Sequence, residues 1–454
     1  MSKVIKLKKG FNINLAGQAE RKVAGEVMPE TFALKPTDFW GIQRPKVLVK
    51  EGDTVKAGTP ILFDKANPKV QFVAPVSGEV VEVVRGAKRK LLEIRILADK
   101  QLVYEEFPKL SASELSALPR EEAVELLARS GVWPHLVQRP YGIIASPDVT
   151  PRAIFISTFD THPLAPEYDF LLKGQERYFQ AGIDMLKRLT DGPVHLGIHA
   201  DAELSPVFAD VKGATLHKFS GKHPAGNVGV QIHHIDPINK GDIVWTINPV
   251  GVVQIGKLLV DGRYDSSKLV ALTGSELTTP QYIKTWSGAQ VGKLIGNGVK
   301  AGELRYISGN VLTGTNVGRE GYLGFHDNMV TVIPEGKYYD FLGWLKPTAD
   351  KLSFHRSFGL LSFLRPNKPF VVDTNLQGEE RAFVQTSSYG KVVPMDIMPE
   401  YLVKAIMAED YDGMEALGIY EVIEEDLALC EFIDVSKHDF QAILREGLTL
   451  MQYS

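Results

Sequence analysis

Two runs of sequence decide how the N-terminal part of the chain folds, Val49-Lys-Glu-Gly-Asp-Thr-Val55 and Ala74-Pro-Val-Ser-Gly78. In each, a short strand-forming stretch meets a glycine, which supplies positive φ at a turn without steric cost. The stretch Lys46–Gly52 (KVLVKEG) is echoed in shape by Val80–Gly86 (VVEVVRG). Two similar halves built of short strands predict a small, quasi-symmetric β-sandwich over residues 32–100.

The regions on either side of the sandwich have different patterns. Residues 1–31 alternate weakly, through Phe11 and Leu15 among others, and predict one or two N-terminal edge strands. Residues 101–260 alternate short apolar strands with helical stretches such as Asp169–Leu189. Strands that alternate with helices are typical of an α/β layer fold. We therefore expect a Rossmann-like α/β domain after the sandwich.

The remainder of the chain predicts two more regions. Residues 261–330 run as two strands, a short helix over Gln290–Ile295 and returning strands, which is the order of a β-grasp module. Residues 331–454 mix loops with helical patterns, and the acid run Glu421–Asp426 is suited to the start of a helix. The predicted fold class is multidomain, with α/β and α+β regions and a mostly helical C-terminal region.

Composition excludes several kinds of site. The 454 residues carry a net charge of −4 without a basic stripe, so we expect no nucleic-acid partner. Cys430 is the single cysteine, which excludes an intrachain disulfide and a protein-held iron–sulfur cluster, since such clusters need several thiolates. A Cys-rich zinc site is excluded for the same reason. The apolar surroundings of Cys430 predict a buried structural thiol.

No stretch of the sequence is long and apolar enough to cross a bilayer. The longest apolar run, Val250–Val260, is interrupted by Gln254 and Lys257 and falls short of the ~20 residues that a spanning helix needs. The basic N-terminus lacks the apolar core of a signal peptide. We expect a soluble or peripheral protein in the cytoplasm.

Further blocks of sequence bring in a resemblance. These blocks are Leu272-Thr-Gly274, Ser308-Gly-Asn-Val-Leu-Thr-Gly314, and a tail from Asp426-Leu-Ala-Leu-Cys430 to Val435-Ser-Lys-His-Asp-Phe440. Together with the biotinyl/lipoyl-like opening runs and the α/β region, they resemble the NqrA family, the A subunits of the sodium-translocating NADH:quinone oxidoreductase. That family is similar to the flavin-binding subunit of complex I and to the C subunit of the Rnf oxidoreductase. The resemblance also marks the β-grasp region as a soluble ligand-binding (SLBB) module.

The resemblance implies a function for the chain. It implies a peripheral subunit, held on the cytoplasmic face of the bacterial inner membrane, that supports quinone reduction coupled to sodium export. FAD, FMN, riboflavin and iron–sulfur centres would lie on other subunits, and the main partner would be the membrane-embedded quinone/flavin subunit. The chain alone would not be catalytic, and we assign it no catalytic residue, cofactor-binding residue or metal ligand.

One difference from the flavin-binding relatives predicts that this chain holds no flavin. The flavin-binding relatives hold the FMN phosphate in a glycine-rich loop, where backbone N–H groups approach because side chains are missing. The corresponding stretch here, Ser130–Gly142, carries the bulky Trp133 and His135. Pro134 and Pro140 in it have no N–H to donate. The sequence therefore predicts that this chain binds no FMN.

Four histidines are candidate site residues. His162 and His223 each precede a proline in a polar loop, and either could face a quinone headgroup, which takes up two protons and favours hydrogen-bond donors. An ordinary loop role for both stays open. His233 and His234 could bind a metal, but no acid or thiol stands at ligand spacing, and strand geometry would point them to opposite faces.

Two further features have alternative interpretations. Asp64-Lys65-Ala66 imitates a lipoylation turn, which keeps a lipoyl or biotin carrier as an alternative function, although Asn67-Pro68 argues against the carrier turn. A stand-alone flavoprotein dehydrogenase is the other alternative. The apolar, basic stretch Leu352–Arg365, with Trp344 before it, is either a core segment or a surface that docks onto membrane-embedded subunits.

Overall fold

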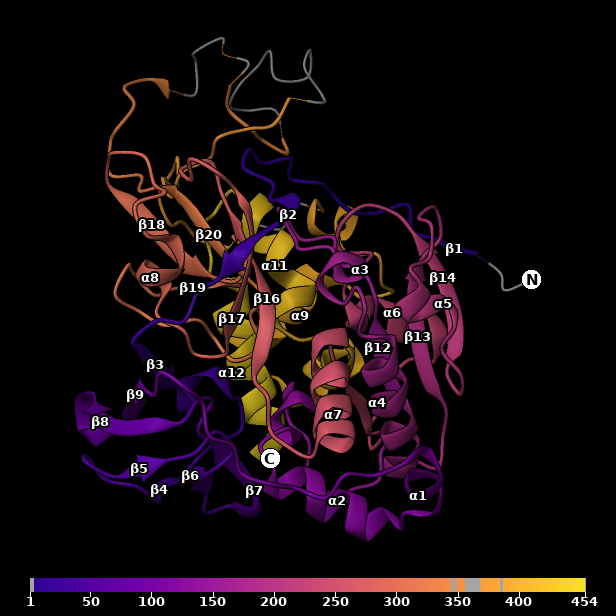
Figure 1. The fold of residues 1–454 in the computed structure, drawn as a ribbon. Helices are drawn as coiled ribbons and strands as arrows, with labels where there is room; N and C mark the ends of the chain where they lie inside the picture. Colours follow the sequence, from indigo (N-terminus) through magenta and orange to yellow (C-terminus); the bar gives the residue numbers. More distant parts are fainter. Residues whose placement is uncertain (1–3, 344–347, 349, 356–367, 384–386, 454) are drawn as a thin grey trace.

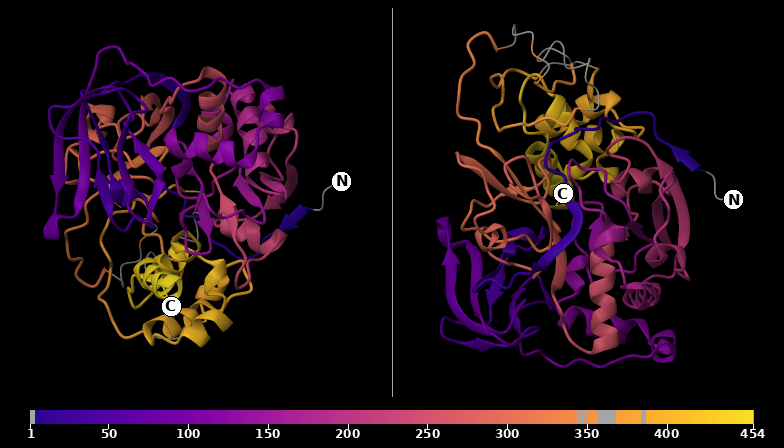
Figure 2. Two further views of the ribbon diagram at one scale, coloured as in Figure 1. Left: turned by 90° about the horizontal axis from the view of Figure 1, so that it is seen from below. Right: turned by 45° about the horizontal axis from the view of Figure 1, so that its top comes forward.

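The computed structural model describes residues 4–343, 348, 350–355, 368–383 and 387–453. In these segments the strands form a four-stranded, a three-stranded, a six-stranded and a seven-stranded sheet. The first two lie together at the lower left of Figure 1, and the helices of the C-terminal region lie behind the other two (Figure 1 and Figure 2). The multidomain architecture predicted from the sequence is confirmed.

The predicted β-sandwich is present. Its four-stranded sheet has the order β3-β9-β8-β5 and its three-stranded sheet the order β4-β6-β7, all antiparallel. Residues that face inward, such as Phe32, Ile61 and Ile94, are fully buried, because alternate side chains of a strand point to one face. The strands are β3 (Thr31–Leu34), β4 (Pro45–Val47), β5 (Thr54–Val55), β6 (Pro60–Asp64), β7 (Asn67–Val73), β8 (Gly78–Arg85) and β9 (Leu91–Ala98).

The α/β layer is built on the seven-stranded sheet, with the order β1-β14-β13-β12-β15-β10-β11. The first five strands of this order run parallel, and β10 is antiparallel to β15. The strands are β1 (Val4–Lys6), β10 (Val137–Arg139), β11 (Ile143–Ile144), β12 (Ile154–Ser157), β13 (Val194–His199), β14 (Thr215–Ser220) and β15 (Val244–Thr246). In open parallel sheets, ligands bind beyond the carboxyl ends of the strands, so those ends are the first place to search for a site.

Helices surround this sheet. The helix α4 packs along α7, while α6 packs on β12. The helices of this region are α1 (Ala112–Ala117), α2 (Arg120–Arg129), α3 (Tyr168–Leu171), α4 (Glu176–Leu189), α5 (Pro206–Ala209), α6 (Val228–Ile235) and α7 (Pro249–Asp261). Asn248 at the N-cap and Pro249 at the first position start α7, and Gly262 at φ +68° ends it, which is how helix ends are commonly specified.

The β-grasp region forms the six-stranded sheet, with the order β19-β18-β20-β16-β17-β2. The short helix α8 (Val291–Ile295) lies between β17 and β18 in the chain, as predicted. Its strands are β2 (Glu20–Glu26), β16 (Ser267–Thr273), β17 (Gln281–Trp286), β18 (Leu304–Ser308), β19 (Thr315–Asn316) and β20 (Met329–Pro334). The strand β2 comes from the far N-terminal end of the sequence, which the β-grasp pattern did not reveal.

The N-terminal segment joins two sheets. The strand β1 pairs with β14 at the edge of the α/β sheet, and β2 pairs with β17 at the edge of the β-grasp sheet. The indigo segment between them crosses from one sheet to the other (Figure 2). The predicted edge strands therefore exist, but the alternation through Phe11 and Leu15 does not form one of them. There the chain contributes a single isolated bridge, from Leu15 to Phe370.

The C-terminal region is helical from Pro399 onward, whereas the described residues between Pro334 and Pro399 form loops and one short 3₁₀ turn, so the prediction of a mostly helical region over 331–454 is right only for its second part. Its helices are α9 (Pro399–Met407), α10 (Tyr411–Ala416), α11 (Glu424–Ile433) and α12 (Phe440–Tyr453), with a short 3₁₀ turn, η7 (Ile419–Glu421), before α11. The acid run lies in the first turn of α11, where carboxylates favour the positive end of the helix dipole. No helix of the described segments combines the length and apolar character that crossing a bilayer requires.

Two predictions about local structure need correction, and a third falls mostly on residues that the structure does not describe. The helix predicted over Asp169–Leu189 is two helices, because Gly174 at φ +81° interrupts it. His233 and His234 lie in α6 rather than on a strand, since their segment continues a helix that starts after Asn227. The stretch Leu352–Arg365 and Trp344 lie mostly outside the described residues.

Candidate functional site

A polar cluster lies beyond the carboxyl ends of β12 and β14. The loop after β12 carries Asp160, Thr161 and His162, and the loop after β14 carries His223. Although β13 lies between the two strands, the rings of His162 and His223 approach to a centroid distance of 4.5 Å. The structure thus brings together the two histidines that the sequence singled out separately.

Both rings are hydrogen-bonded at Nδ1. The Nδ1 of His162 lies 2.6 Å from Oδ1 of Asp160, so it donates to that carboxylate. The hydroxyl oxygen of Thr161 accepts a bond of 2.9 Å from the N–H of Gly226 and lies 3.0 Å from Nδ1 of His223, to which it can donate its own hydrogen. A neutral imidazole that accepts at Nδ1 carries its proton on Nε2. In that tautomer, His223 is a donor at Nε2.

The charges of the two rings differ. Burial lowers the pKa of His162, but the carboxylate of Asp160 outweighs burial and holds that pKa above its usual value. Burial and the neighbouring positive ring of His162 lower the pKa of His223 to about 2. Despite burial, His162 keeps the pKa of Asp160 below its usual value. The surroundings therefore favour the charged form of His162 and the neutral form of His223.

The first turn of α11 covers the cluster from the other side. Arg139, at the end of β10, donates to Oδ2 of Asp426 at 2.8 Å and to Oε1 of Glu425 at 2.7 Å. The side chains of Arg139 and Asp426 are 1% and 0% exposed. Asn227, the residue before α6, donates to the backbone carbonyl of Glu425 at 3.0 Å. The cluster is thus closed between the α/β sheet and the C-terminal helices.

The close approach of α6 to the Arg139–Asp426 ion pair depends on a glycine. A Cβ on Gly229 in α6 would lie 2.6 Å from Nη1 of Arg139 and 2.6 Å from Oδ2 of Asp426. Burial and the charge of Asp426 raise the pKa of Glu425, while Arg139 opposes them. A compact ion-pair group of this kind is costly to bury unless its hydrogen bonds are satisfied.

Several polar atoms in the cluster are not satisfied. Within the described segments, five buried side-chain atoms here have no hydrogen-bond partner: Nε2 of His162, Nε2 of His223, Oδ1 of Asn227, Nε of Arg139 and Oδ1 of Asp426. An unpaired buried polar group costs about 1–3 kcal/mol, so water or a ligand is expected beside them. Two adjacent imidazole Nε2 atoms that carry hydrogens can polarise a carbonyl oxygen.

A second buried polar cluster joins three regions of the chain. Lys268 of β16 donates to the backbone carbonyl of Asp327 at 2.6 Å, and the Asp38 carboxylate accepts from the N–H of Phe325 at 2.9 Å. Burial lowers the pKa of Lys268 to about 8 and that of His326 to about 4. The role of this cluster is structural, because the ammonium group of Lys268 donates to the backbone carbonyls of Phe325 and Asp327.

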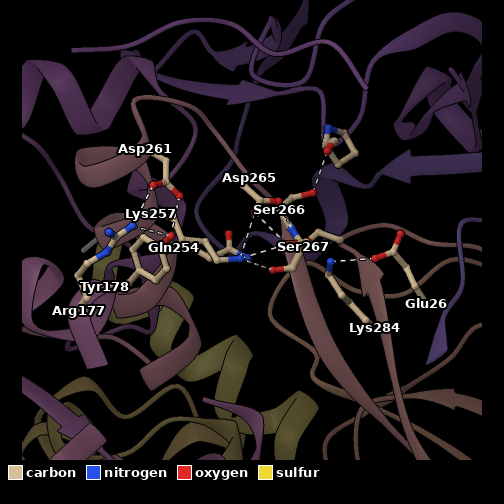
Figure 3. A network of polar contacts seen from close by, with 12 residues as sticks. Glu26, Arg177, Tyr178, Gln254, Lys257, Asp261, Asp265, Ser266, Ser267 and Lys284 are labelled. Carbon is tan, nitrogen blue, oxygen red and sulfur yellow. Dashed lines mark hydrogen bonds and ion pairs between the residues drawn. The ribbon is translucent and has the colours of Figure 1, made fainter. Parts of the chain in front are cut away.

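A third network joins α7 to β16 (Figure 3). Nζ of Lys257 lies 3.2 Å from Oδ2 of Asp265 and 3.1 Å from both the carbonyl and the hydroxyl of Ser267. Ser266 donates to the carbonyl of Pro75 at 2.8 Å, which ties this junction to the sandwich. The network holds neighbouring regions in place and presents no open reactive group.

The stretch Ser130–Gly142 packs its side chains into the core. The indole of Trp133 is fully buried, donates to the carbonyl of Ala145 at 2.8 Å and lies edge-on to Trp245 at 5.5 Å. Burial lowers the pKa of His135 to about 3. A segment that turns bulky side chains inward in this way leaves little free backbone for a phosphate.

The remaining sequence candidates are placed as follows. His233 contacts Glu421 at 2.7 Å and His234 contacts the carbonyl of Pro394 at 2.8 Å, so the two rings serve different partners. Among the described residues, no group of three or more His, Cys, Asp or Glu side chains could hold a metal. Cys430 is fully buried, as predicted, and burial raises the pKa of its thiol.

Lys65 requires a correction. Lys65 and Ala66 form an exposed two-residue turn between β6 and β7. Asn67 and Pro68 start β7 and do not disturb this turn, so the expectation that they spoil the carrier geometry is wrong. The carboxylate of Asp64 accepts from the N–H of Ala66 at 3.2 Å and holds the turn.

Sequence reasoning missed most of the partners in the His162–His223 cluster. Arg139 sits in a strand of three residues beside a proline, which gives no periodic signal. Glu425 and Asp426 were assigned to the start of a helix, which is correct, but their contact across the chain was not foreseen. Gly229 is the usable signal, because a glycine inside a helix often marks a close approach.

Known proteins resemble this chain along most of its length. Three family models match it: the NqrA N-terminal barrel-sandwich hybrid domain over residues 5–99, the NqrA second alpha/beta domain over 118–264 and the NQRA C-terminal domain over 269–319. Two crystal structures of an NAD+-reducing [NiFe]-hydrogenase align over 78% of the chain and 67% of theirs, at 11% identity with TM-scores of 0.36 and 0.37. These two scores are too low to support an argument.

Several curated relatives match over nearly their whole length, and each is named as the A subunit of a Na(+)-translocating NADH-quinone reductase. The protein of Serratia proteamaculans is 38% identical over 454 residues, with 99% of both chains covered. Those of Alcanivorax borkumensis and Rhodopirellula baltica are each 37% identical, with 98–99% of either chain covered. By this likeness, the chain belongs to the NqrA family, the A subunits of the Na(+)-translocating NADH-quinone reductase.

Proposed function

We propose that this chain is the NqrA component of a sodium-pumping NADH:quinone reductase and that it supports quinone reduction coupled to sodium export. The observation that carries the proposal is the 38% identity to the Serratia protein over 99% of both chains. The chain docks at the cytoplasmic face of a bacterial inner membrane through the membrane-embedded quinone/flavin subunit. FAD, FMN, riboflavin and iron–sulfur centres belong to the other subunits.

Within this proposal the chain has no redox centre of its own. The inward packing of Trp133 and the absence of a glycine-rich run in Ser130–Gly142 support this view. A titration of the purified chain with FMN or NADH is expected to show no binding in the low micromolar range. A dissociation constant in or below that range for either ligand would contradict the proposal.

Five regions make up the proposed component. They are N-terminal strands over 1–31, a biotinyl/lipoyl-like sandwich over 32–100, a Rossmann-like α/β domain over 101–260, an SLBB-type β-grasp module over 261–330 and a helical region over 331–454. The four sheets support this division, although β1 and β2 each complete a sheet of another region. Its distant relatives, in this proposal, include the flavin-binding subunit of complex I and the C subunit of the Rnf oxidoreductase.

The cluster of His162 and His223 is the proposed quinone-facing site. With His223 in the tautomer that carries its proton on Nε2, two unpaired Nε2–H donors lie beside each other and suit a carbonyl oxygen that gains electron density during reduction. His223 is 1% exposed, so a headgroup reaches the donors only when the first turn of α11 moves aside.

Substitution in the assembled complex tests this site. We expect His162→Phe and His223→Phe each to raise the KM for quinone about tenfold, because each removes one hydrogen-bond donor. His195→Phe, on β13, is the control, and NADH oxidation by an artificial acceptor should stay unchanged in all three. An unchanged KM in both site variants would remove the site from the quinone path and leave the membership of the complex standing.

A further inference from the structure

Two adjoining hollows lie between the edge of the seven-stranded sheet and the C-terminal helices. Each has a volume of about 550 Å³. They share three lining residues, Lys240, Glu415 and Tyr420, and therefore form one continuous groove, here called the α10 groove. The first hollow is further lined by Gln138, Pro140, Tyr141, Gly241, Asp242, Ile243, Tyr411, Asp412 and Met451, and the second by Ile238, Asn239, Asp396, Ile397, Met398, Ala416, Leu417, Gly418 and Glu421.

Large apolar and aromatic side chains line the α10 groove. The rings of Tyr141 and Tyr420 meet edge-on at a centroid distance of 6.3 Å. At the rim, Met398 is 60% exposed and Tyr411 is 41% exposed. Aromatic side chains offer rigid contact area with a polar tip, and they are enriched where partners bind. The groove can therefore bury the side chains of an extended chain segment.

Most charges in the groove are paired internally. Lys240 and Glu415 lie 2.8 Å apart, and Asp242 pairs with Arg152 at 3.0 Å. Glu421 contacts His233 at 2.7 Å. One carboxylate in each hollow has no such partner among the described residues.

Those carboxylates are Asp412 in the first hollow and Asp396 in the second. Within the part of the chain that the structure describes, neither forms an ion pair. Both side chains are exposed, so each hollow has an acid at its rim. An occupant that presents a cation at each end, with apolar residues between, would match this pattern.

We propose that the α10 groove receives an extended, Lys- or Arg-bearing segment of another subunit of the complex. The inference rests on the proposed function, which supplies membrane-embedded partners. Cytoplasmic loops of membrane proteins carry an excess of Lys and Arg, the charge that the two free carboxylates favour. Anionic lipid and nucleic acid would be repelled by them. A second copy of this chain, with its net charge of −4, is also a poor match.

Photo-crosslinking in the assembled complex identifies the occupant. Benzoyl-phenylalanine replaces Met398 or Tyr411 at the groove, or Val81 on the sandwich as the control. Mass spectrometry is expected to find both groove positions joined to one Lys- or Arg-bearing segment of another subunit, and the control position not joined to it. Crosslinks to a second copy, to lipid or to a segment without cations would overturn the proposal, as would no crosslink in an intact complex.

Charge removal provides an independent test. Asp396→Asn with Asp412→Asn keeps the size of both side chains and removes two charges. Glu79→Gln with Glu125→Gln makes the same charge change at exposed positions elsewhere. At about 150 mM salt, we expect the first pair to weaken co-purification of the partner subunits about tenfold and the control pair to leave it within twofold.

The outcomes separate the two claims. If the unaltered chain fails to co-purify with any subunit of the complex, the proposed function is wrong. If the unaltered chain and the Asp396→Asn/Asp412→Asn variant co-purify equally well at low and at high salt, the proposed function stands and the groove is not the docking site.

Discussion

Replacing the buried Arg139 by methionine should destabilise the first turn of α11. The substitution leaves the carboxylate of Asp426, which is 0% exposed, without its cationic partner. Removing one member of a buried ion pair costs about 3–5 kcal/mol, because the other charge stays buried and uncompensated. At 1.4 kcal/mol for each factor of ten, the exchange of α11 amide hydrogens should accelerate about 140- to 3,700-fold.

Hydrogen–deuterium exchange followed by mass spectrometry measures this effect peptide by peptide. Arg139→Met combined with Asp426→Asn should recover most of the protection, since the fully buried charge of Asp426 is then removed together with that of its partner, and the amide oxygen can still accept from the N–H of Ile423. Lys284→Met is the matched control: its pair with Glu26 is about half exposed on both sides and should cost about 0–1 kcal/mol. If α11 exchanges in Arg139→Met within fivefold of its original rate, the ion pair does not hold the helix.

The remaining predictions concern acid, packing and modification. Burial holds the pKa of His135, His223 and His326 at about 3, 2 and 4. Between these values and pH ~6.5, each histidine takes up a proton only when the protein unfolds. The free energy of unfolding should therefore be highest above pH ~6.5 and fall by about 4 kcal/mol per pH unit below pH ~6. Urea unfolding at pH 7 and pH 5 checks this, and equal midpoints would contradict it. Gly229→Ala should lower the melting temperature by several degrees, because its Cβ has no room beside the buried ion pair; an unchanged melting temperature would refute this. The intact mass of the chain expressed with lipoyl and biotin ligases should be that of the unmodified protein, whereas a covalent gain at Lys65 would establish a carrier.

The sequence predicted those parts of the fold whose signals are local. The sandwich and the β-grasp order follow from short alternating strands between glycines, and the first turn of α11 follows from its acids. Pairing between distant segments has no such signal. Nothing in Glu20–Glu26 indicates that this strand completes a sheet formed mainly by residues after Ser266. His233 and His234 were assigned to a strand because a short apolar run fits either period.

The candidate site shows the same limit. His162 and His223 stand out in sequence because each lies in a polar loop before a proline. Their contact depends on the order β14-β13-β12, which aligns the carboxyl ends of strands far apart in the chain. Arg139 and Asp426 become a pair only when α11 packs on the sheet. Residue type can indicate candidate site residues, but tertiary packing determines which of them come into contact.

The α10 groove and the His162–His223 cluster meet at one short stretch of chain. Tyr420 and Glu421 line the groove, and five residues later Asp426 pairs with Arg139 over the cluster. A segment bound in the groove contacts η7. The 3₁₀ turn η7 leads directly into the first turn of α11, and that turn covers the two histidines. Linkage requires the effect to be reciprocal: if docking favours one position of α11, then a ligand that needs that position at the histidines must strengthen docking by the same factor. Access to the proposed quinone-facing site would then depend on assembly of the complex.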